Sequence, residues 1–221
     1  MHNIFKSYRI VLLISSILIF AACNRSEKTY FEDGTLKSEI QKSGGHYNGT
    51  ATWYYSNGIK QHEVNYVNDT LQGDSTRLYN NGKMHSMENF KNNHLHGKSE
   101  TYDMNGKKLS EQNYHLDTLD GPYIEFYTSG QPKIEGQYKM GNFDGRWIYY
   151  EDDGYIIGIG EFDNGSGKQR GWYRNGTLKQ EVSYKDNLKN GREILYNADG
   201  TIARIVTYQD DEVISTEEIN P

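Results

Sequence analysis

The chain is poor in the residues that mark several common protein classes. It has 221 residues but only one cysteine and three prolines. A single thiol has no partner within the chain, which excludes an internal disulfide framework. The 24 lysines and arginines are scattered among 30 acidic residues, for a net charge of −6. An acidic chain without a basic block lacks the electrostatic surface of a nucleic-acid-binding protein.

Catalytic signatures are also missing. The sequence has no Gly-x-Ser-x-Gly elbow and no glycine-rich phosphate loop leading into a helix. We therefore expect a protein that is not an enzyme and needs no cofactor. His94 and His96 have the spacing that puts two imidazoles on one side of an extended segment, but the sequence fixes no third ligand near them. We predict no metal site.

The only long apolar run lies at the N-terminus, from Ile10 to Phe20, after Lys6 and Arg9. It is short for a membrane span, and a charged start with small residues at the end is typical of a secretory signal. The alternative is an uncleaved anchor helix with an incidental cysteine.

The segment that ends this run, Phe20-Ala21-Ala22-Cys23, resembles the lipobox of bacterial lipoproteins. The resemblance implies that residues 1–22 are a signal peptide, that Cys23 carries the lipid, and that 23–29 form a tether. The protein would then be anchored to a membrane of the bacterial cell envelope, the outer membrane if the cell is Gram-negative, and be periplasmic or surface-exposed.

Glycine, in contrast, is abundant and regularly placed. Most glycines of one series close an Asn-Gly or Asp-Gly pair, and successive members lie about 24 residues apart. The series is Gly34, Gly58, Gly82, Gly106, Gly130, Gly154, Gly176 and Gly200. The sixth unit, from Gly154, is two residues short, and the missing residues fall between Phe162 and Gly167. We predict a repeat domain over 30–208 and an acidic tail or cap over 209–221.

Each unit reads as two strands joined by a tight turn. Asn-Gly between alternating polar and apolar residues is a strong hairpin signal. One hairpin buries too little to stand alone, so neighbouring hairpins must pair edge to edge. The predicted fold is all-β: a solenoid-like array of about eight antiparallel hairpins forming one extended, twisted sheet.

Side-chain alternation gives a more detailed prediction. Tyr54 and its equivalents stand four residues before the turn glycine, and Tyr66 and its equivalents stand eight after it. A three-residue first turn, Ser56-Asn57-Gly58, would put both aromatic rows on one face and the repeated glutamates on the other. The second connection of each unit looks longer and polar, and its one apolar residue, such as Leu71, is expected to plug the end of the sheet.

A second aromatic row stands one residue nearer the turn: Phe31, Tyr55, Tyr79, Tyr127 and Tyr173. On the polar face, these rings could stack on a sugar or anchor a peptide. The alternative is that they only cover the twisted sheet and shield the hairpin ends.

The segment from Trp172 through the Asn175-Gly176 turn and Leu178 to Tyr184 resembles the MORN-repeat variant of proteins labelled YwqK-type antitoxins. The resemblance implies a β-hairpin solenoid. We interpret the protein as a membrane-anchored, non-catalytic scaffold that binds a protein or glycan of the envelope and no nucleic acid. The alternative is an antitoxin or immunity protein that neutralises a toxin by direct contact. A third hypothesis is an envelope enzyme.

Overall fold

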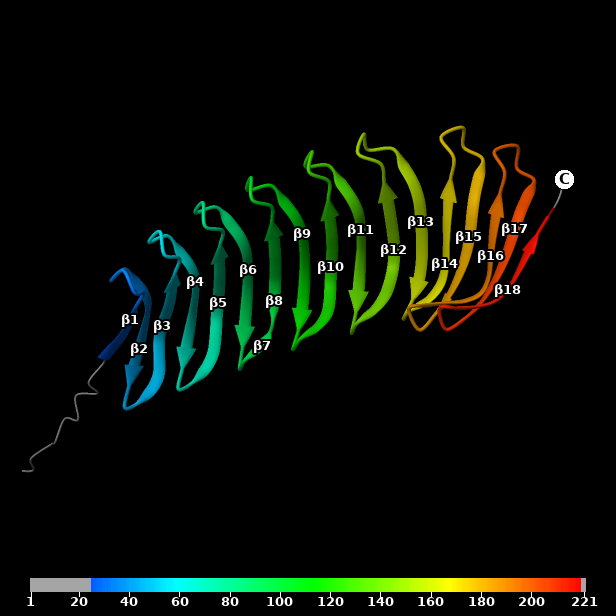
Figure 1. The fold of residues 1–221 in the computed structure, drawn as a ribbon. Coiled ribbons are helices and arrows are strands. Elements are labelled where there is room, and N and C mark those ends of the chain that lie inside the picture. The colour runs from blue at the N-terminus through cyan, green and yellow to red at the C-terminus, as the bar shows by residue number, and fades with distance from the viewer. Residues whose placement is uncertain (1–24, 220–221) are drawn as a thin grey trace, which may run out of the picture.

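A computed structural model describes residues 25–219 as one open antiparallel sheet. Consecutive strands are hydrogen-bonded to each other, and β7 and β8 are two parts of one strand beside β6. Figure 1 shows the hairpins following one another in chain order. The predicted all-β repeat array is confirmed. The predicted signal peptide and Cys23 lie outside the described residues.

The strands, in chain order, are β1 (Arg25–Tyr30), β2 (Leu36–Ser43), β3 (His46–Tyr54), β4 (Lys60–Val67), β5 (Thr70–Leu78), β6 (Met84–Lys91), β7 (His94–Leu95), β8 (Gly97–Tyr102), β9 (Lys108–His115), β10 (Thr118–Phe126), β11 (Pro132–Lys139), β12 (Asn142–Tyr150), β13 (Ile156–Asp163), β14 (Ser166–Trp172), β15 (Leu178–Lys185), β16 (Leu188–Tyr196), β17 (Ile202–Gln209) and β18 (Glu212–Glu218). The sheet therefore extends beyond the predicted limits of 30–208: β1 occupies part of the predicted tether, and β18 part of the predicted tail.

The first turn of each unit has three residues, as predicted. In the second unit the Gly58 amide donates to the Tyr55 carbonyl at 2.9 Å, and the Tyr55 amide donates to the Ile59 carbonyl at 2.8 Å. Gly58 has a φ of 80°, which is the left-handed conformation that this turn needs at its last position. All eight turn glycines of the repeat have positive φ.

A β-bulge directly after this turn overturns the predicted arrangement of the aromatic rows. Tyr54 pairs with Lys60, but Trp53 pairs with His62, so Gln61 is an extra residue on β4. The same shift recurs in every first-turn hairpin. An extra residue on one strand of a pair changes which side chains share a face beyond it.

The two aromatic rows consequently lie on opposite faces, and the prediction of one shared face is wrong. Tyr66 pairs with Gly49, two positions in register from the pair Ala51–Val64 and on the side of Trp53. The Tyr54 row instead shares its face with the repeated glutamates: the Tyr102 hydroxyl donates to Glu100 at 2.7 Å and that of Tyr150 to Glu135 at 2.8 Å.

The second connection is a tight turn rather than a long polar loop. In the unit of β4 and β5 it consists of Asn68 and Asp69, which have φ values of 47° and 64°. Positive φ at both central residues is typical of a two-residue type I′ hairpin. Leu71 does not plug the sheet end as predicted. It lies on β5 directly opposite Tyr66, and Leu95, Leu119 and Phe143 have the same place beside their own aromatic partners.

Both ends of each hairpin are clasped to the next hairpin. At the type I′ turns, the Asp69 amide donates to the Tyr47 carbonyl at 2.9 Å, and the Tyr47 amide donates to Asp69 Oδ1 at 2.7 Å. At the opposite end, Asn57 Nδ2 donates to the Asn80 carbonyl at 2.9 Å. These bonds join units that are one repeat apart, so they stabilise the stack and not the single hairpin.

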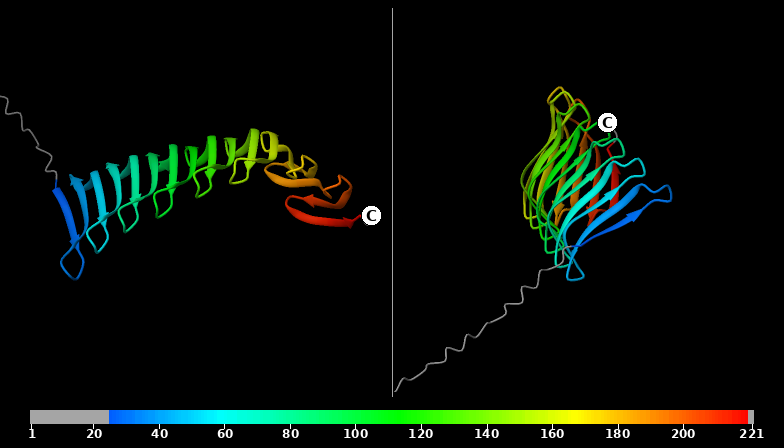
Figure 2. Two further views of the ribbon diagram at one scale, coloured as in Figure 1. Left: turned by 90° about the horizontal axis from the view of Figure 1, so that it is seen from above. Right: turned by 90° about the vertical axis from the view of Figure 1, so that its left-hand side faces the viewer.

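The short sixth unit is where the array bends. Strands β13 and β14 pair without the bulge found in the equivalent pairs. The Asn187 side chain reaches past the neighbouring turn: its Oδ1 accepts from the Phe143 amide at 2.8 Å, and its Nδ2 donates to the Gly141 carbonyl at 3.0 Å. Figure 2 shows the array arching, with β14–β18 turned away from the line of the earlier hairpins.

We predict that restoring the two missing residues straightens the array. Inserting Leu-Asp between Ser166 and Gly167 reproduces the Leu119-Asp120 pair that precedes Gly121 and should restore the bulge. Small-angle X-ray scattering should then report a larger radius of gyration and maximum dimension. The same dipeptide inserted after Ser129, in a first turn, is the control and should leave both values nearly unchanged. Equal dimensions for the Ser166 insertion and the parent would contradict this origin of the bend.

Candidate binding surface on the concave face

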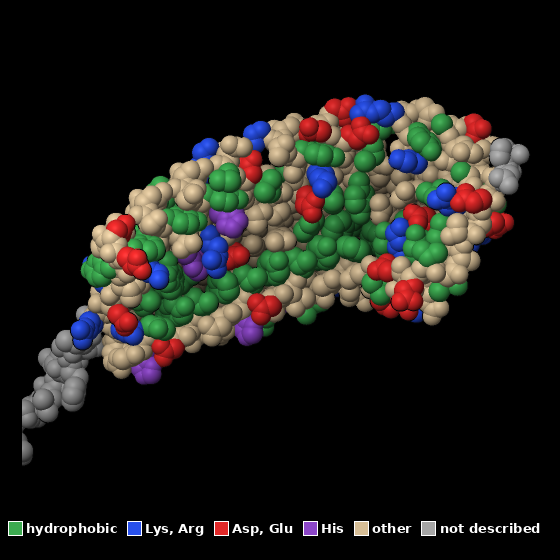
Figure 3. All heavy atoms as spheres, viewed as in Figure 1, with side chains coloured by type: hydrophobic (Ala, Val, Ile, Leu, Met, Phe, Trp, Pro, Cys, Tyr) green, Lys and Arg blue, Asp and Glu red, His purple; other side chains and the backbone are tan. Residues whose placement is uncertain are grey.

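One face of the sheet lies on the inside of the arch, and we call it the concave face. Figure 3 shows a continuous apolar band along it. The band consists of the aromatic row Tyr66, Phe90, Tyr114, Tyr138, Phe162, Tyr184 and Tyr208 together with Leu71, Leu95, Leu119 and Phe143 opposite. Tyr66, Phe90, Tyr114, Tyr138, Tyr184 and Tyr208 are only half-buried, because no second layer covers this sheet.

The band thickens into an aromatic cluster in the middle of the array. The Trp147 ring lies 4.8 Å from that of Phe143 and 5.0 Å from that of Tyr138, and the Phe143 ring lies 5.3 Å from that of Phe162. Tyr123 lies 5.6 Å from Trp147. Only 3% of Trp147 is exposed. Such ring pairs stabilise a surface beyond the area they bury.

Two strand glycines make room for this cluster. A Cβ on Gly136 would lie 2.2 Å from Trp147 Cδ2, and one on Gly160 would lie 2.3 Å from Phe162 Cε2. A glycine inside a strand often marks a close approach of this kind. This was the signal in the sequence that could have located the cluster, since Trp147 belongs to neither predicted row.

Toward the N-terminus the same columns carry smaller or polar side chains. Ala51 and Ser75 are fully buried there. His62 stacks on Trp53 with ring centroids 5.3 Å apart, and its Nε2 lies 3.0 Å from the Ser75 hydroxyl. Burial, with the nearby Arg77 guanidinium, lowers the pKa of His62 to about 4. This imidazole is therefore neutral at pH 7 and part of the packing.

The opposite face carries a cluster of ion pairs in the fourth unit. Lys98 and Lys108 each contact both Glu100 and Glu111, at 2.6 to 3.0 Å. Burial alone would raise the pKa of Glu100, but hydrogen bonds from Lys108, Lys98 and Tyr102 lower it to about 2. Its carboxylate stays charged across the physiological range. The same face also carries apolar side chains, among them Ile124, Phe126 and Ile148, so the ion pairs occupy only part of it.

The predicted row of contact residues lies on the side opposite to the Tyr54 row, as expected, but this is the concave side and not the face of the repeated glutamates, so the prediction of a polar face for it is wrong. The tyrosine hydroxyls of this row are already engaged. Tyr55, Tyr79, Tyr127 and Tyr173 each donate to the backbone carbonyl of a residue in the next unit, at 2.8 to 2.9 Å. Phe31 has no hydroxyl and lies under the Lys37 ammonium. The row thus forms a seam between units, which supports the covering role considered as the alternative.

The histidines are similarly occupied or isolated. His94 Nδ1 lies 2.5 Å from Asp117 Oδ2, in a type I′ turn. His96 Nδ1 is buried without a hydrogen-bond partner, and its ring lies 5.1 Å from that of His115. Within residues 25–219 no group of three or more histidine, cysteine or acidic residues could hold a metal ion.

A cleft of about 480 Å³ opens on the concave face at the bend. Its floor is the pair Gly158 and Gly171, which face each other on β13 and β14. Tyr149, Tyr173 and the side chains of Gln169 and Gln180 line its walls. Of these residues, only Tyr173 was among the predicted contacts. The shortened spacing before Gly167 marked the place but not the cavity.

The family of the protein is decided by its repeats. A model described as the MORN repeat variant matches residues 26–41, 47–68, 71–92, 95–115, 119–140 and 166–186, which together cover more than half of the chain. The chain belongs to the MORN repeat variant family. MORN repeats generally bind proteins or membranes. The family model does not match residues 141–165, which include β13, the first strand of the pair without a bulge.

Other comparisons are less informative. No curated protein matches the chain. A solved structure titled "Crystal Structure of TcdB2-TccC3-TEV" is 14% identical, with 82% of this chain and 12% of that chain covered and a TM-score of 0.23. A likeness at that score carries no argument. Between residues 25 and 219, no helix has the length and apolar character to cross a membrane.

We predict that the tyrosine seam contributes to stability through its hydroxyls. Changing Tyr55, Tyr79 and Tyr127 together to Phe keeps the rings but removes three bonds between units, so the free energy of unfolding should fall by about 1 kcal/mol for each bond. Urea denaturation measures this loss. Tyr30→Phe is the control, because Tyr30 is 58% exposed. An unchanged midpoint for the triple variant would show that the bonds are replaced by water without loss.

Proposed function

We propose that this protein is a non-catalytic scaffold of the cell envelope that uses its concave face to bind a protein or glycan partner. The observation that carries the proposal is the uncovered apolar band that runs from Tyr66 to Tyr208 along the inside of the arch. Contiguous exposed apolar surface on a soluble domain is typical of an interaction site.

The shape of the array supports the same function. Hydrogen bonds between units hold the band as a single continuous sheet, so a partner need not order the surface when it binds. Pre-organisation lowers the entropic cost of association. Half-buried aromatic side chains such as Tyr114 and Tyr138 also combine large contact area with few rotatable bonds, which suits them to be anchors.

The second candidate is an antitoxin or immunity protein. It is favoured by the resemblance of the Trp172 to Tyr184 segment to YwqK-type proteins, and it would use the same concave face. Export is compatible with this role only if the toxin acts in the envelope. An envelope enzyme is the third hypothesis. The hydroxyl of Ser75, which lies 3.0 Å from His62 Nε2, is buried and so does not favour it.

Anchoring is tested by replacing Cys23. We expect Cys23→Ala to move the protein from the membrane fraction to the soluble fraction, because the acyl chains that hold it would be absent. Cell fractionation with immunoblotting measures the distribution, and Asn24→Ala is the neighbouring control. A Cys23→Ala protein that stays in the membrane fraction would overturn the lipoprotein proposal in favour of an uncleaved anchor.

Binding on the concave face is tested by photocrosslinking in cells that make the protein naturally. Benzoylphenylalanine at Tyr114, on the concave face, should yield a defined adduct after irradiation. The same group at Tyr102, on the opposite face beside Glu100, is the matched control and should yield none. Mass spectrometry of the adduct separates the candidates, because a small protein that is toxic when expressed alone indicates the antitoxin. Equal adducts from both positions, or none from Tyr114, would contradict the proposal.

A further inference from the structure

The cleft at the bend exists because two side chains are missing there. Gly158 and Gly171 face each other in register on the concave face. In the second unit His62 stands at the position equivalent to Gly158, and its ring stacks on Trp53 and occupies the space above the sheet. In the sixth unit no side chain rises from either position, and a cavity the size of a small ligand remains.

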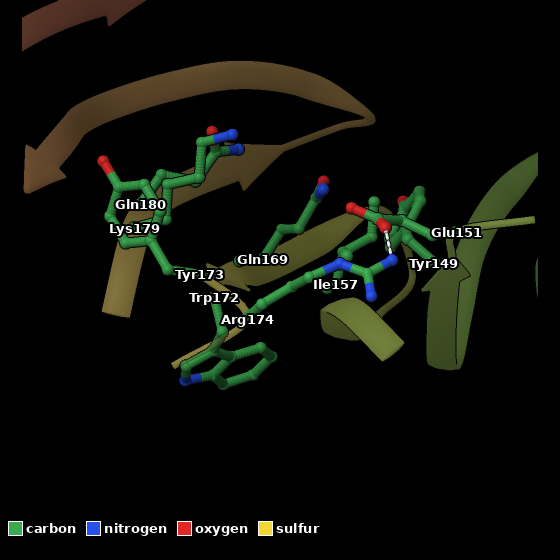
Figure 4. A pocket seen from close by; sticks show the side chains of 11 residues that line it. Tyr149, Glu151, Ile157, Gln169, Trp172, Tyr173, Arg174, Lys179 and Gln180 are labelled. Carbon is green, nitrogen blue, oxygen red and sulfur yellow. Dashed lines mark hydrogen bonds and ion pairs between the residues drawn. The ribbon is translucent and has the colours of Figure 1, made fainter. Parts of the chain in front are cut away.

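The walls of the cleft combine rings with amides. Figure 4 shows Gln169 rising between two groups, with Lys179 and Gln180 on one side and Arg174 with Glu151 on the other. The Tyr184 hydroxyl donates to Gln169 Oε1 at 3.3 Å, and the amide NH₂ of Gln169 has no acceptor among the described residues. Gln180 makes no side-chain hydrogen bond to the rest of residues 25–219. The cleft therefore presents polar groups that still need partners.

One cation at the rim has no ion-pair partner among the described residues. Arg174 is neutralised, since it bonds both Glu151 and Asp153. The Lys179 ammonium lies 5.7 Å above the Tyr173 ring and, among the described residues, forms no ion pair. It is available to an anion that enters the cleft.

We propose that this cleft binds a pyranose ring that bears a carboxylate, as found in an acidic glycan. The Tyr149 and Tyr173 rings suit the apolar C–H faces of a sugar. The amides of Gln169 and Gln180 suit hydroxyls, which both donate and accept. Lys179 suits the carboxylate.

A purely apolar anchor from a protein partner fits this cleft less well. Such a side chain would remove water from Gln169 and Gln180 and leave their amides unpaired. Burying an amide without a hydrogen-bond partner is unfavourable. The hydroxyls of a sugar avoid this cost, so the observations favour the glycan.

This inference rests on the proposed function, because it names a ligand class for one place on the same concave face. The two can fail separately. Crosslinks from Tyr114 without sugar binding would leave the scaffold in place and remove only the glycan site. Sugar binding without crosslinks from Tyr114 would keep the glycan site and remove the scaffold proposal.

The test is a titration of the ¹⁵N-labelled residues 24–221 with D-glucuronate and D-glucose, which differ in the carboxylate. We expect both sugars to shift the side-chain amide signals of Gln169 and Gln180. Glucuronate should bind about twofold to fivefold more tightly, the upper part of the range for one exposed ion pair. N-acetyltryptophan amide serves as the apolar probe and should shift these signals little.

Two variants give the test its controls. Lys179→Gln should abolish the preference for glucuronate and keep glucose binding. Lys37→Gln changes the equivalent lysine of the first unit, which also lies 5.7 Å from an aromatic ring, and should change nothing. Backbone amide signals away from position 179 report that each variant is folded. The proposal would be overturned if neither sugar shifts the Gln169 and Gln180 signals, or if glucuronate and glucose bind with equal affinity. It would also be overturned if the preference for glucuronate survives Lys179→Gln, or if the tryptophan probe binds in place of the sugars.

Discussion

Contact between neighbouring units is the constraint on which this structure depends. A single-layer sheet has no second layer to bury its faces, and the described residues contain only six buried apolar side chains. Stability must therefore come from bonds that repeat along the stack: the strand ladders, the Asp69-type clasps at the type I′ turns and the Tyr55-type seam at the first turns. Each of these joins one unit to the next, which is the energetic pattern of a solenoid.

The stacking rule also explains why a small local change has a large effect. When the bulge is missing between β13 and β14, the following hairpins cannot continue in line. Asn187 then clasps the turn of Gly141 and Phe143, two turns away. In the same strand pair Gly158 lies opposite Gly171, in the register that His62 and Arg77 have in the second unit, and the absence of both side chains opens the cleft. The unit that departs most from the repeat is thus the one that differs most in its surface.

Much of the fold could be predicted from residue spacing. The period of the turn glycines identified the hairpins, because that signal is local. The three-residue turn was predicted correctly, but from the expectation that both aromatic rows share one face, and the rows lie on opposite faces. The two aromatic rows could not be assigned to the correct faces, because no local sequence pattern indicates the bulge at Gln61. One extra residue moves all following side chains of a strand to the other face. The prediction of a shared aromatic face failed for that reason alone.

The binding surface could be predicted only in part from the sequence. The Tyr66 row was recognised as a continuous series, but it was predicted to share a face with the Tyr54 row, whereas it lies on the opposite face and is half-exposed. Tyr55 and its equivalents were singled out as contacts, yet their hydroxyls bond the next unit. Trp147 and the cleft depend on which strand glycines lie beneath which rings, and that is a property of the register.

The stacking account is tested most directly by native-state amide hydrogen exchange on the whole array. Because each unit is stabilised by its neighbours, exchange should be slowest in β10–β13, around the Trp147 cluster, and should become faster step by step toward β1 and β18. Removing β17 and β18 should then raise the exchange rates of β15 and β16 more than those of β3 and β4. A single exchange rate for all protected amides, changed equally by the truncation, would contradict it.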